Sequence, residues 1–102
     1  MNEMQIFQND EVGKVRLMEN EDGSISISAE DTAMGFGWTT VAKSGNEVIR
    51  WARINEYCKQ LGFSPEVGKD DYIPESLFYM LGMKANNPTA LKFQKWLAFD
   101  VI

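Results

Sequence analysis

A strand passes into a helix within eight residues, Ser24-Ile25-Ser26-Ile27-Ser28-Ala29-Glu30-Asp31. Serine and isoleucine alternate strictly at first, and this period of two predicts a β-strand that buries both isoleucines. Ser28 can then cap a helix, because its hydroxyl can accept a hydrogen bond from a free N–H group of the first turn. The two acids that follow suit the positive end of the helix dipole. The stretch therefore predicts an antiparallel strand joined directly to a short helix.

Two further strands are expected upstream of this stretch. Met4-Gln5-Ile6-Phe7 is a short apolar run, and Val15 and Leu17 alternate with charged residues after a polar turn. The step Asp22-Gly23 is a strong turn signal before the third strand. The first third of the chain thus predicts a meander of two or three antiparallel strands.

A second hairpin is expected after the first helix, which should end at Gly35 or Gly37. The segments 38–41 and 47–51 are rich in strand-forming residues, and Lys43-Ser44-Gly45-Asn46 between them is typical of a turn. This hairpin makes up the rest of the predicted β structure.

Helical periodicity governs the remainder of the chain. One helix is expected from about Trp51 to Gly62, with an apolar stripe of Ile54, Tyr57, Cys58 and Leu61. After a connector over 63–72, Pro74 opens a second helix whose inner face is Leu77, Met80 and Leu81. Asn87 caps a last helix with Pro88 at its first position and Ala90, Phe93, Trp96 and Leu97 on its buried side. The predicted fold is α+β: a small N-terminal antiparallel sheet, a meander plus a second hairpin, packed against three to four α-helices.

Composition excludes several classes of chemistry. The chain has 102 residues, which suits one domain, and 44% of them are hydrophobic. It has no histidine and a single cysteine, Cys58, so an internal disulfide, a zinc site and a histidine base are excluded. No apolar run approaches the roughly 20 residues of a membrane span. We expect a cytoplasmic protein that binds no membrane.

Catalytic motifs are not found either. Gly35-Phe36-Gly37 has the start of a dinucleotide-binding pattern but lacks its third glycine, and helix-ending glycines explain it better. The acidic pairs, such as Glu30-Asp31, are sequence neighbours, whose side chains normally point apart. The sequence therefore predicts no enzyme, no catalytic residue, no metal, no cofactor and no small-molecule substrate.

Charge is distributed unevenly along the chain. The net charge is −5, which by itself argues against binding to a phosphate backbone. Residues 1–31, however, hold eight acids and two bases, whereas residues 32–102 hold seven acids and eight bases. A basic face on the second part is therefore possible. Its candidate DNA-contacting residues are Lys43, Arg50, Arg53, Lys84, Lys92 and Lys95.

The order of segments resembles a known family. Met4-Gln5-Ile6-Phe7, the run from Ile27 to Gly37 and the run Tyr72-Ile73-Pro74-Glu75-Ser76-Leu77-Phe78-Tyr79 are similar to segments of phage antirepressors. The most specific block is Asn87-Pro88 followed by Lys92-Phe93-Gln94-Lys95-Trp96-Leu97. Together they resemble the BRO family N-terminal domain of prophage antirepressors and insect DNA viruses, over essentially the whole chain.

The resemblance implies a regulator of the phage lysogeny/lysis switch in a bacterial host. This domain, residues 1–102, would be DNA-binding and would be followed by a separate C-terminal domain in a longer chain. If it binds double-stranded DNA, charge reversal at Lys92 and Lys95 should abolish binding. The alternative is a protein-protein module that binds the phage repressor or its own copies, with Trp38 and Phe99 as exposed anchors. A third reading is a structural or homo-oligomerisation module that is indifferent to both DNA and repressor.

Overall fold

A four-stranded antiparallel sheet and a separate two-stranded hairpin combine with four α-helices in the computed structural model, which describes residues 3–9, 13–63, 66–85 and 87–101. The sheet has the order β1-β2-β3-β6, formed by Glu3–Asn9, Gly13–Glu19, Ile25–Ser28 and Tyr72–Pro74. The hairpin consists of β4 (Thr39–Val41) and β5 (Glu47–Ile49). The helices are α1 (Ala29–Gly35), α2 (Trp51–Gln60), α3 (Glu75–Gly82) and α4 (Pro88–Trp96), and a π-helical turn, η1 (Leu97–Val101), continues α4. The predicted α+β class is confirmed.

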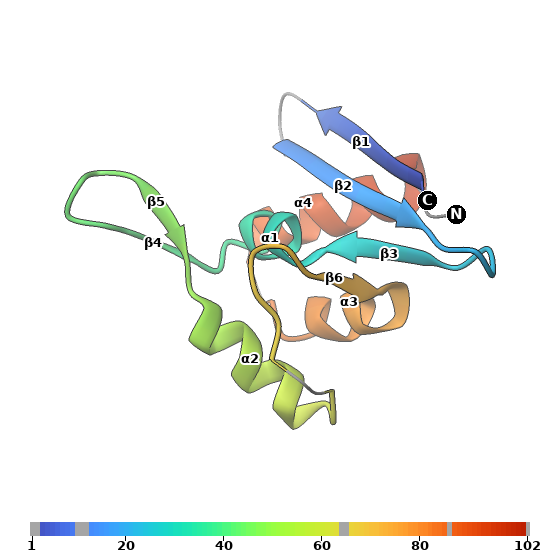
Figure 1. Cartoon of the computed structure of the whole chain (residues 1–102). Helices are drawn as coiled ribbons and strands as arrows, with labels where there is room; N and C mark the ends of the chain where they lie inside the picture. Colours follow the sequence, from blue (N-terminus) through green and yellow to red (C-terminus); the bar gives the residue numbers. More distant parts are fainter. Residues whose placement is uncertain (1–2, 10–12, 64–65, 86, 102) are drawn as a thin grey trace.

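The sheet is covered on one face by helices, while the β4–β5 hairpin projects from the body (Figure 1). The predicted meander of β1, β2 and β3 is confirmed, and so is the second hairpin. Phe7 lies opposite Val15, and Leu17 lies opposite Ile27, so these side chains form the apolar inner face of the sheet. None of the helices in the described ranges is long and apolar enough to cross a lipid bilayer.

The fourth strand, β6, is a correction to the sequence-based prediction. Tyr72 was expected in a connector and Pro74 in a helix, but Tyr72–Pro74 pairs antiparallel with β3, with Ile73 opposite Ile27. Both isoleucines are fully buried. A strand of three residues has too short a pattern to be recognised locally, and only its long-range pairing defines it. Helix α3 therefore begins at Glu75, with Pro74 as its N-cap residue.

The start of α1 is held by the cap expected from the sequence. The Ser28 hydroxyl accepts a hydrogen bond from the Asp31 backbone N–H at 3.2 Å. The Asp31 carboxylate in turn accepts hydrogen bonds from the backbone N–H of Arg16 at 2.8 Å and from its Nε at 2.9 Å, while Arg16 Nη2 reaches Glu30 Oε1 at 2.8 Å. The expectation that Glu30 and Asp31 point apart is therefore wrong, because Arg16 on β2 draws both carboxylates together. We name Arg16, Ser28, Glu30 and Asp31 the Arg16 clamp.

Three phenylalanines form the centre of the core. Phe36, Phe78 and Phe93 are fully buried, and the Phe36 ring centroid lies 5.2 Å from that of Phe78 and 5.7 Å from that of Phe93. They join the end of α1 to α3 and α4. Helix α1 ends at Gly35, and Gly37 has a φ of +77°, so the interpretation of these glycines as a helix end is confirmed.

The helix faces agree with the predicted stripes with one exception. Ile54 and Cys58 of α2 are buried as expected, and Trp96 of α4 is half-buried. In α3, however, Met80 is exposed, and Phe78 takes its place in the core. The periodicity of residues 75–82 predicts a helix correctly. It does not predict which side of α3 faces inward, because α3 directly follows β6, whose Ile73 is paired with Ile27 of β3.

Helix α4 begins as the sequence predicts. The Asn87 side-chain oxygen accepts a hydrogen bond from the Ala90 N–H at 2.8 Å, and Pro88 occupies the first turn. The amide group of Asn87 also donates to the Phe36 carbonyl oxygen at 3.1 Å. One side chain thus caps α4 and ties it to the residue that ends α1.

Candidate nucleic-acid interface

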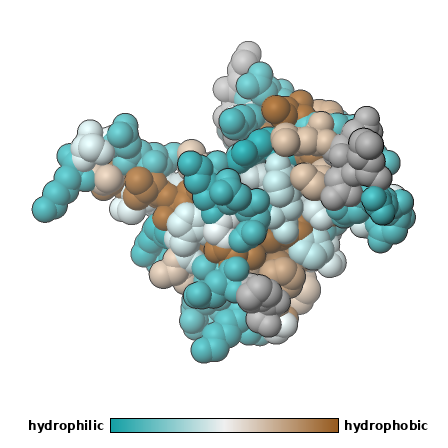
Figure 2. Space-filling model, viewed as in Figure 1, coloured by the Kyte–Doolittle hydropathy of each residue, from teal (hydrophilic) through white to brown (hydrophobic). Residues whose placement is uncertain are grey.

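The β4–β5 hairpin and helix α2 form a continuous unit, residues 39–60, which we name the arm. The hairpin turn is closed by hydrogen bonds from Ala42 N to Asn46 O and from Gly45 N to Ala42 O, both 2.9 Å long. Gly45 has a φ of +89°, a conformation that glycine adopts without strain. Lys43 therefore sits at the tip of a two-stranded ribbon that stands clear of the body (Figures 1 and 2).

Trp38 attaches the arm to the core. Its indole is only 6% exposed and lies 5.2 Å from the Phe36 ring and 5.0 Å from the Tyr57 ring, measured between centroids. Its carbonyl oxygen accepts a hydrogen bond from the Arg50 N–H at 3.0 Å, which closes the base of the hairpin. The prediction that Trp38 is an exposed anchor for a protein partner is therefore wrong, because this side chain is used inside the fold.

Tyr57 brings two candidate cations together on α2. Arg53 Nη1 lies 3.5 Å from the Tyr57 hydroxyl, and Lys84 Nζ lies 5.9 Å from the centre of the tyrosine ring. Lys84 also donates a hydrogen bond to Gln60 Oε1 at 3.1 Å. A cation within about 6 Å of an aromatic ring is attracted by its quadrupole. Lys84, which follows α3 in the sequence, thus becomes part of the surface of α2.

The six candidate DNA-contacting residues are all exposed, but the structure divides them into two sets. Lys43 at the hairpin tip, Arg50 at its base, and Arg53 and Lys84 beside Tyr57 follow the arm. Lys92 and Lys95 lie on α4, which Figure 1 shows running behind the sheet and away from the arm. The arm set follows one unit of the chain, in which the hairpin projects from the body and α2 packs on it through Ile54 and Cys58, whereas the α4 pair belongs to a different part of the surface.

The charge of the arm differs in sign from that of the rest of the molecule. Residues 39–60 contain four bases and two acids, a balance of +2, whereas the remaining residues contain six bases and thirteen acids, a balance of −7. The local potential of a projecting unit depends on its own charges more than on the net charge of the chain. The overall −5 therefore does not exclude a polyanion at the arm.

The N-terminus of α2 carries positive charge. Like α4, α2 has no acid in its first turn, and like α3 it has no side-chain cap hydrogen bond, but its N-cap residue is Arg50. Arg53 follows within the first turn. Positive charge at this end opposes the helix dipole, so this arrangement lowers the stability of the helix. Departures from local rules of this kind are expected at functional sites.

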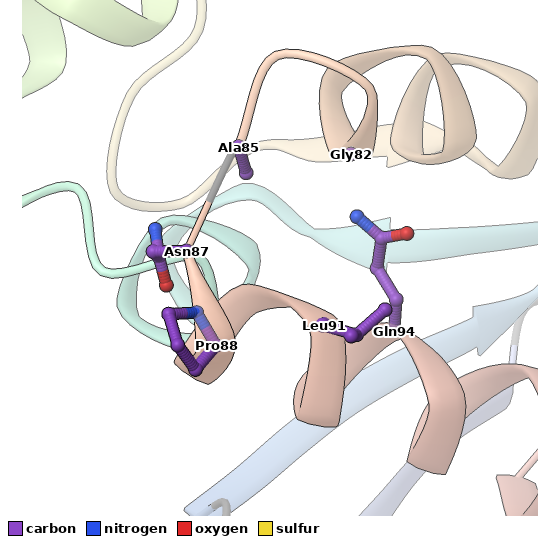
Figure 3. Close-up of a pocket in the computed structure, with 6 residues that line it drawn as sticks. All are labelled: Gly82, Ala85, Asn87, Pro88, Leu91 and Gln94. Atoms are coloured by element: carbon purple, nitrogen blue, oxygen red, sulfur yellow. The ribbon is translucent and has the colours of Figure 1, made fainter.

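An open groove lies between the end of α3 and the start of α4. It has a volume of about 410 Å³ and is lined by Gly82, Ala85, Asn87, Pro88, Leu91 and Gln94 (Figure 3). These side chains are apolar or carry amides, and none of them titrates. The groove can accept an apolar or amide group of a partner, but its described lining offers no acid, base or nucleophile.

A second hollow lies at the foot of the arm, with a volume of about 380 Å³. Side chains of both charges line it, together with Met34, Val48, Ile49 and Trp51. Among its carboxylates, that of Asp31 is already bound by Arg16. Mixed charge of this kind does not select an anion or a cation.

The remaining reactive groups are structural. Cys58 is buried, and burial raises the pKa of its thiol, so the thiolate is disfavoured. Across the described ranges, His, Cys, Asp and Glu form no group of three or more that could hold a metal ion. Phe99, the other predicted protein-contact residue, is 79% exposed on η1.

Comparison with family models, with curated proteins and with solved structures yields no significant match to this chain. The resemblance to the BRO family domain therefore stays a prediction from the residues quoted above.

Two features of the surface were not found from the sequence. One is the contact of Tyr57 with Arg53. The sequence predicts Tyr57 only as a member of the buried stripe, although side chains four residues apart lie on the same helix face. The other is the exposure of Leu91 and Met83, which is 60% and 85% respectively. No sequence signal reveals the exposure of Leu91 and Met83, because large apolar residues are more often buried than exposed.

Proposed function

We propose that this chain is the DNA-binding N-terminal domain of an antirepressor-type regulator of the phage lysogeny/lysis switch, and that it binds double-stranded DNA through the arm. The observation that carries the proposal is the arm, in which a projecting hairpin leads into α2: residues 39–60 have a balance of +2 on an otherwise acidic molecule, and Lys84 joins Arg53 beside Tyr57. The resemblance to the BRO family domain supports the same function.

The shape of the arm suits a duplex. The major groove of B-DNA is about 12 Å wide and admits either a helix or a two-stranded antiparallel ribbon. With the ribbon at the groove, Lys43 at its tip and Arg50 at its base are placed to bind phosphates on either side. Arg53 and Lys84 extend the cationic surface along α2. The arm thus supplies positioning contacts to phosphate along its whole length.

Neutralising the base of the arm is expected to weaken DNA binding. In the double variant Arg50→Gln/Arg53→Gln, the dissociation constant for a fluorescent duplex should rise at least about tenfold, and the slope of log K against log salt should fall by about 2. Both side chains are exposed, so the fold should persist, which circular dichroism can check. Fluorescence anisotropy over a range of salt concentrations measures both quantities.

The matched control removes the same charge from the other cationic surface. Lys92→Gln/Lys95→Gln also removes two positive charges, and we expect it to leave the salt slope unchanged. If this pair reduces the slope and the arginine pair does not, DNA lies on α4, whose two lysines are also among the six candidates from the sequence, and the arm assignment is wrong. If the unchanged protein binds no duplex at physiological salt, the proposed function itself is wrong.

A second candidate function is binding of the phage repressor protein. It is favoured by exposed apolar side chains: Leu91 lines the groove of Figure 3, and Met83, which follows the groove residue Gly82 in the chain, and Phe99 on η1 are exposed as well. Large exposed apolar side chains next to a groove are typical of protein contacts. This candidate predicts a complex with the repressor in the absence of any duplex DNA.

A further inference from the structure

Strand β1 presents an open edge of the sheet. All seven of its residues, Glu3–Asn9, pair with β2 on one side, from Glu3 opposite Glu19 to Asn9 opposite Gly13. On the other side, no strand within the described ranges pairs with it, and Figure 1 shows it as the outermost strand. Every second residue of such a strand directs its N–H and C=O groups outward, where they can bond to another strand.

This edge lacks the features that usually prevent strand pairing. Natural edge strands are protected by charged side chains, by proline, by a bulge or by shortness. Residues Met4–Gln8 contain no charged residue and no proline, and the pairing with β2 continues for seven residues without a bulge. Met4 and Ile6 are both exposed, and because side chains alternate along a strand they lie on the same face.

We propose that a second copy of this chain adds its own β1 antiparallel to this edge, so that two four-stranded sheets become one sheet of eight strands across a two-fold axis. A register centred on Ile6 pairs all seven residues of both strands. It places Ile6 opposite Ile6 of the other copy and each Met4 opposite Gln8 of the other copy, so the two Ile6 and two Met4 side chains lie on one face along a diagonal. A two-fold interface needs a patch that is complementary to itself, and β1 meets this condition in the antiparallel register centred on Ile6.

Charge does not oppose a second copy in this register despite the acidic first third of the chain. In this register Glu3 pairs with Asn9 of the other copy, so no two acidic residues within β1 pair across the axis. The two Glu3 residues lie six positions apart along the pair, about 20 Å at the rise of a β-strand, which exceeds the screening length at physiological salt. The carboxylates of Glu30 and Asp31 are already engaged by Arg16 on the same chain.

The dimer is independent of the proposed function. β1 is the edge of the sheet opposite to β6, and the arm extends from the other side of the fold (Figure 1). Pairing through β1 therefore leaves both arms free. It would give the regulator two copies of the candidate interface, but it does not require that either copy bind DNA.

Charge exchange at the centre of the register tests the dimer. By sedimentation velocity over a range of protein concentrations, the unchanged chain should show a reversible monomer–dimer equilibrium. Ile6→Lys places two like charges opposite each other, and so does Ile6→Glu, so each variant alone should raise the dimer dissociation constant at least about tenfold. An equimolar mixture of the two variants should restore dimerisation, because lysine then faces glutamate. Ile6 is 59% exposed but lies opposite Arg16 of the clamp on β2, so circular dichroism must first show that each variant is folded.

The control is Leu91→Lys, which makes the same change at a side chain that is 60% exposed on α4. It should leave the dimer dissociation constant unchanged. The proposal is overturned if the unchanged chain is monomeric at every concentration, if Leu91→Lys weakens the dimer as much as Ile6→Lys, or if the mixture of charge variants stays monomeric. A complex that forms only with an unrelated strand and never with a second copy would overturn it as well.

Discussion

Replacing Asp31 with alanine should lower the free energy of unfolding by about 1–3 kcal/mol, because the Arg16 backbone N–H is left without an acceptor and the Arg16 guanidinium loses its hydrogen bonds to the Asp31 carboxylate. The Asp31 side chain is 4% exposed, and its Oδ2 accepts hydrogen bonds from both the N–H and the Nε of Arg16. Strand β2 pairs with β3 only as far as Leu17, so the Arg16 N–H has Asp31 in place of a strand partner. Urea denaturation followed by tryptophan fluorescence measures the loss.

The neighbouring acid provides a matched control. Glu30 binds the same guanidinium at 2.8 Å, but its side chain is partly exposed and receives no backbone N–H of Arg16. Glu30→Ala should therefore cost less than about 1 kcal/mol, as is usual for partly solvated ion pairs. Equal losses from the two variants would show that the clamp is an ordinary surface ion pair and not a support for α1.

The stability that the Arg16 guanidinium contributes through the clamp should stay constant over the physiological pH range. The hydrogen bond that the Arg16 side chain donates to Asp31 raises the pKa of Arg16 above its already high ordinary value. A cation whose pKa is raised by folding contributes stability below its unfolded pKa and loses it only as the pH rises through the folded value. Because both values lie far above neutrality, this contribution is constant over the range in which the protein works.

Local signals in the sequence were sufficient for the helix starts and the meander. Ser28 and Asn87 both cap helices as predicted, because an N-cap depends on residues only two or three positions away. The alternation around Ile25 and Ile27 gave the strand and its buried face for the same reason. Where a few neighbouring residues decide a feature, the sequence contains the information.

The features that the sequence did not reveal depend on distant contacts. The pairing of β6 with β3 joins residues that are far apart in the chain, and the two acids of the clamp converge only because Arg16 lies between them. The sequence predicts Trp38 on the surface, because the second ring that encloses it, Tyr57, lies on a helix further along the chain. For the candidate interface, the sequence predicts the six basic residues but not their separation into the arm set and the α4 pair. That separation depends on tertiary contacts, because Lys84 joins the arm set through Tyr57 and Gln60.

Replacing Gly35 with alanine should destabilise the protein by about 1–3 kcal/mol, because the added methyl group meets a rigid ring. Gly35 is the last residue of α1 and lies against Phe93, whose ring atoms would fall inside van der Waals contact distance of a Cβ there. Phe93 is fully buried between Phe36 and Phe78, so its ring has no space into which to move. For a domain of this size the midpoint of thermal unfolding should fall by roughly 4–8 °C per kcal/mol.

Gly82 is the matched control, since it is likewise the last residue of its helix, α3. A Cβ at Gly82 would also meet a side chain of α4 too closely, but that side chain is the end of Gln94, which has several rotatable bonds and lines an open groove. Gln94 can therefore turn aside, and Gly82→Ala should change the midpoint little or raise it slightly through the better helix propensity of alanine. If Gly82→Ala proves as damaging as Gly35→Ala, the rigidity of the Phe36, Phe78 and Phe93 cluster is not what makes Gly35 necessary. If only Gly35→Ala is damaging, the aromatic core that holds α1 and α4 together, and with them the base of the arm at Trp38, has no tolerance for added volume.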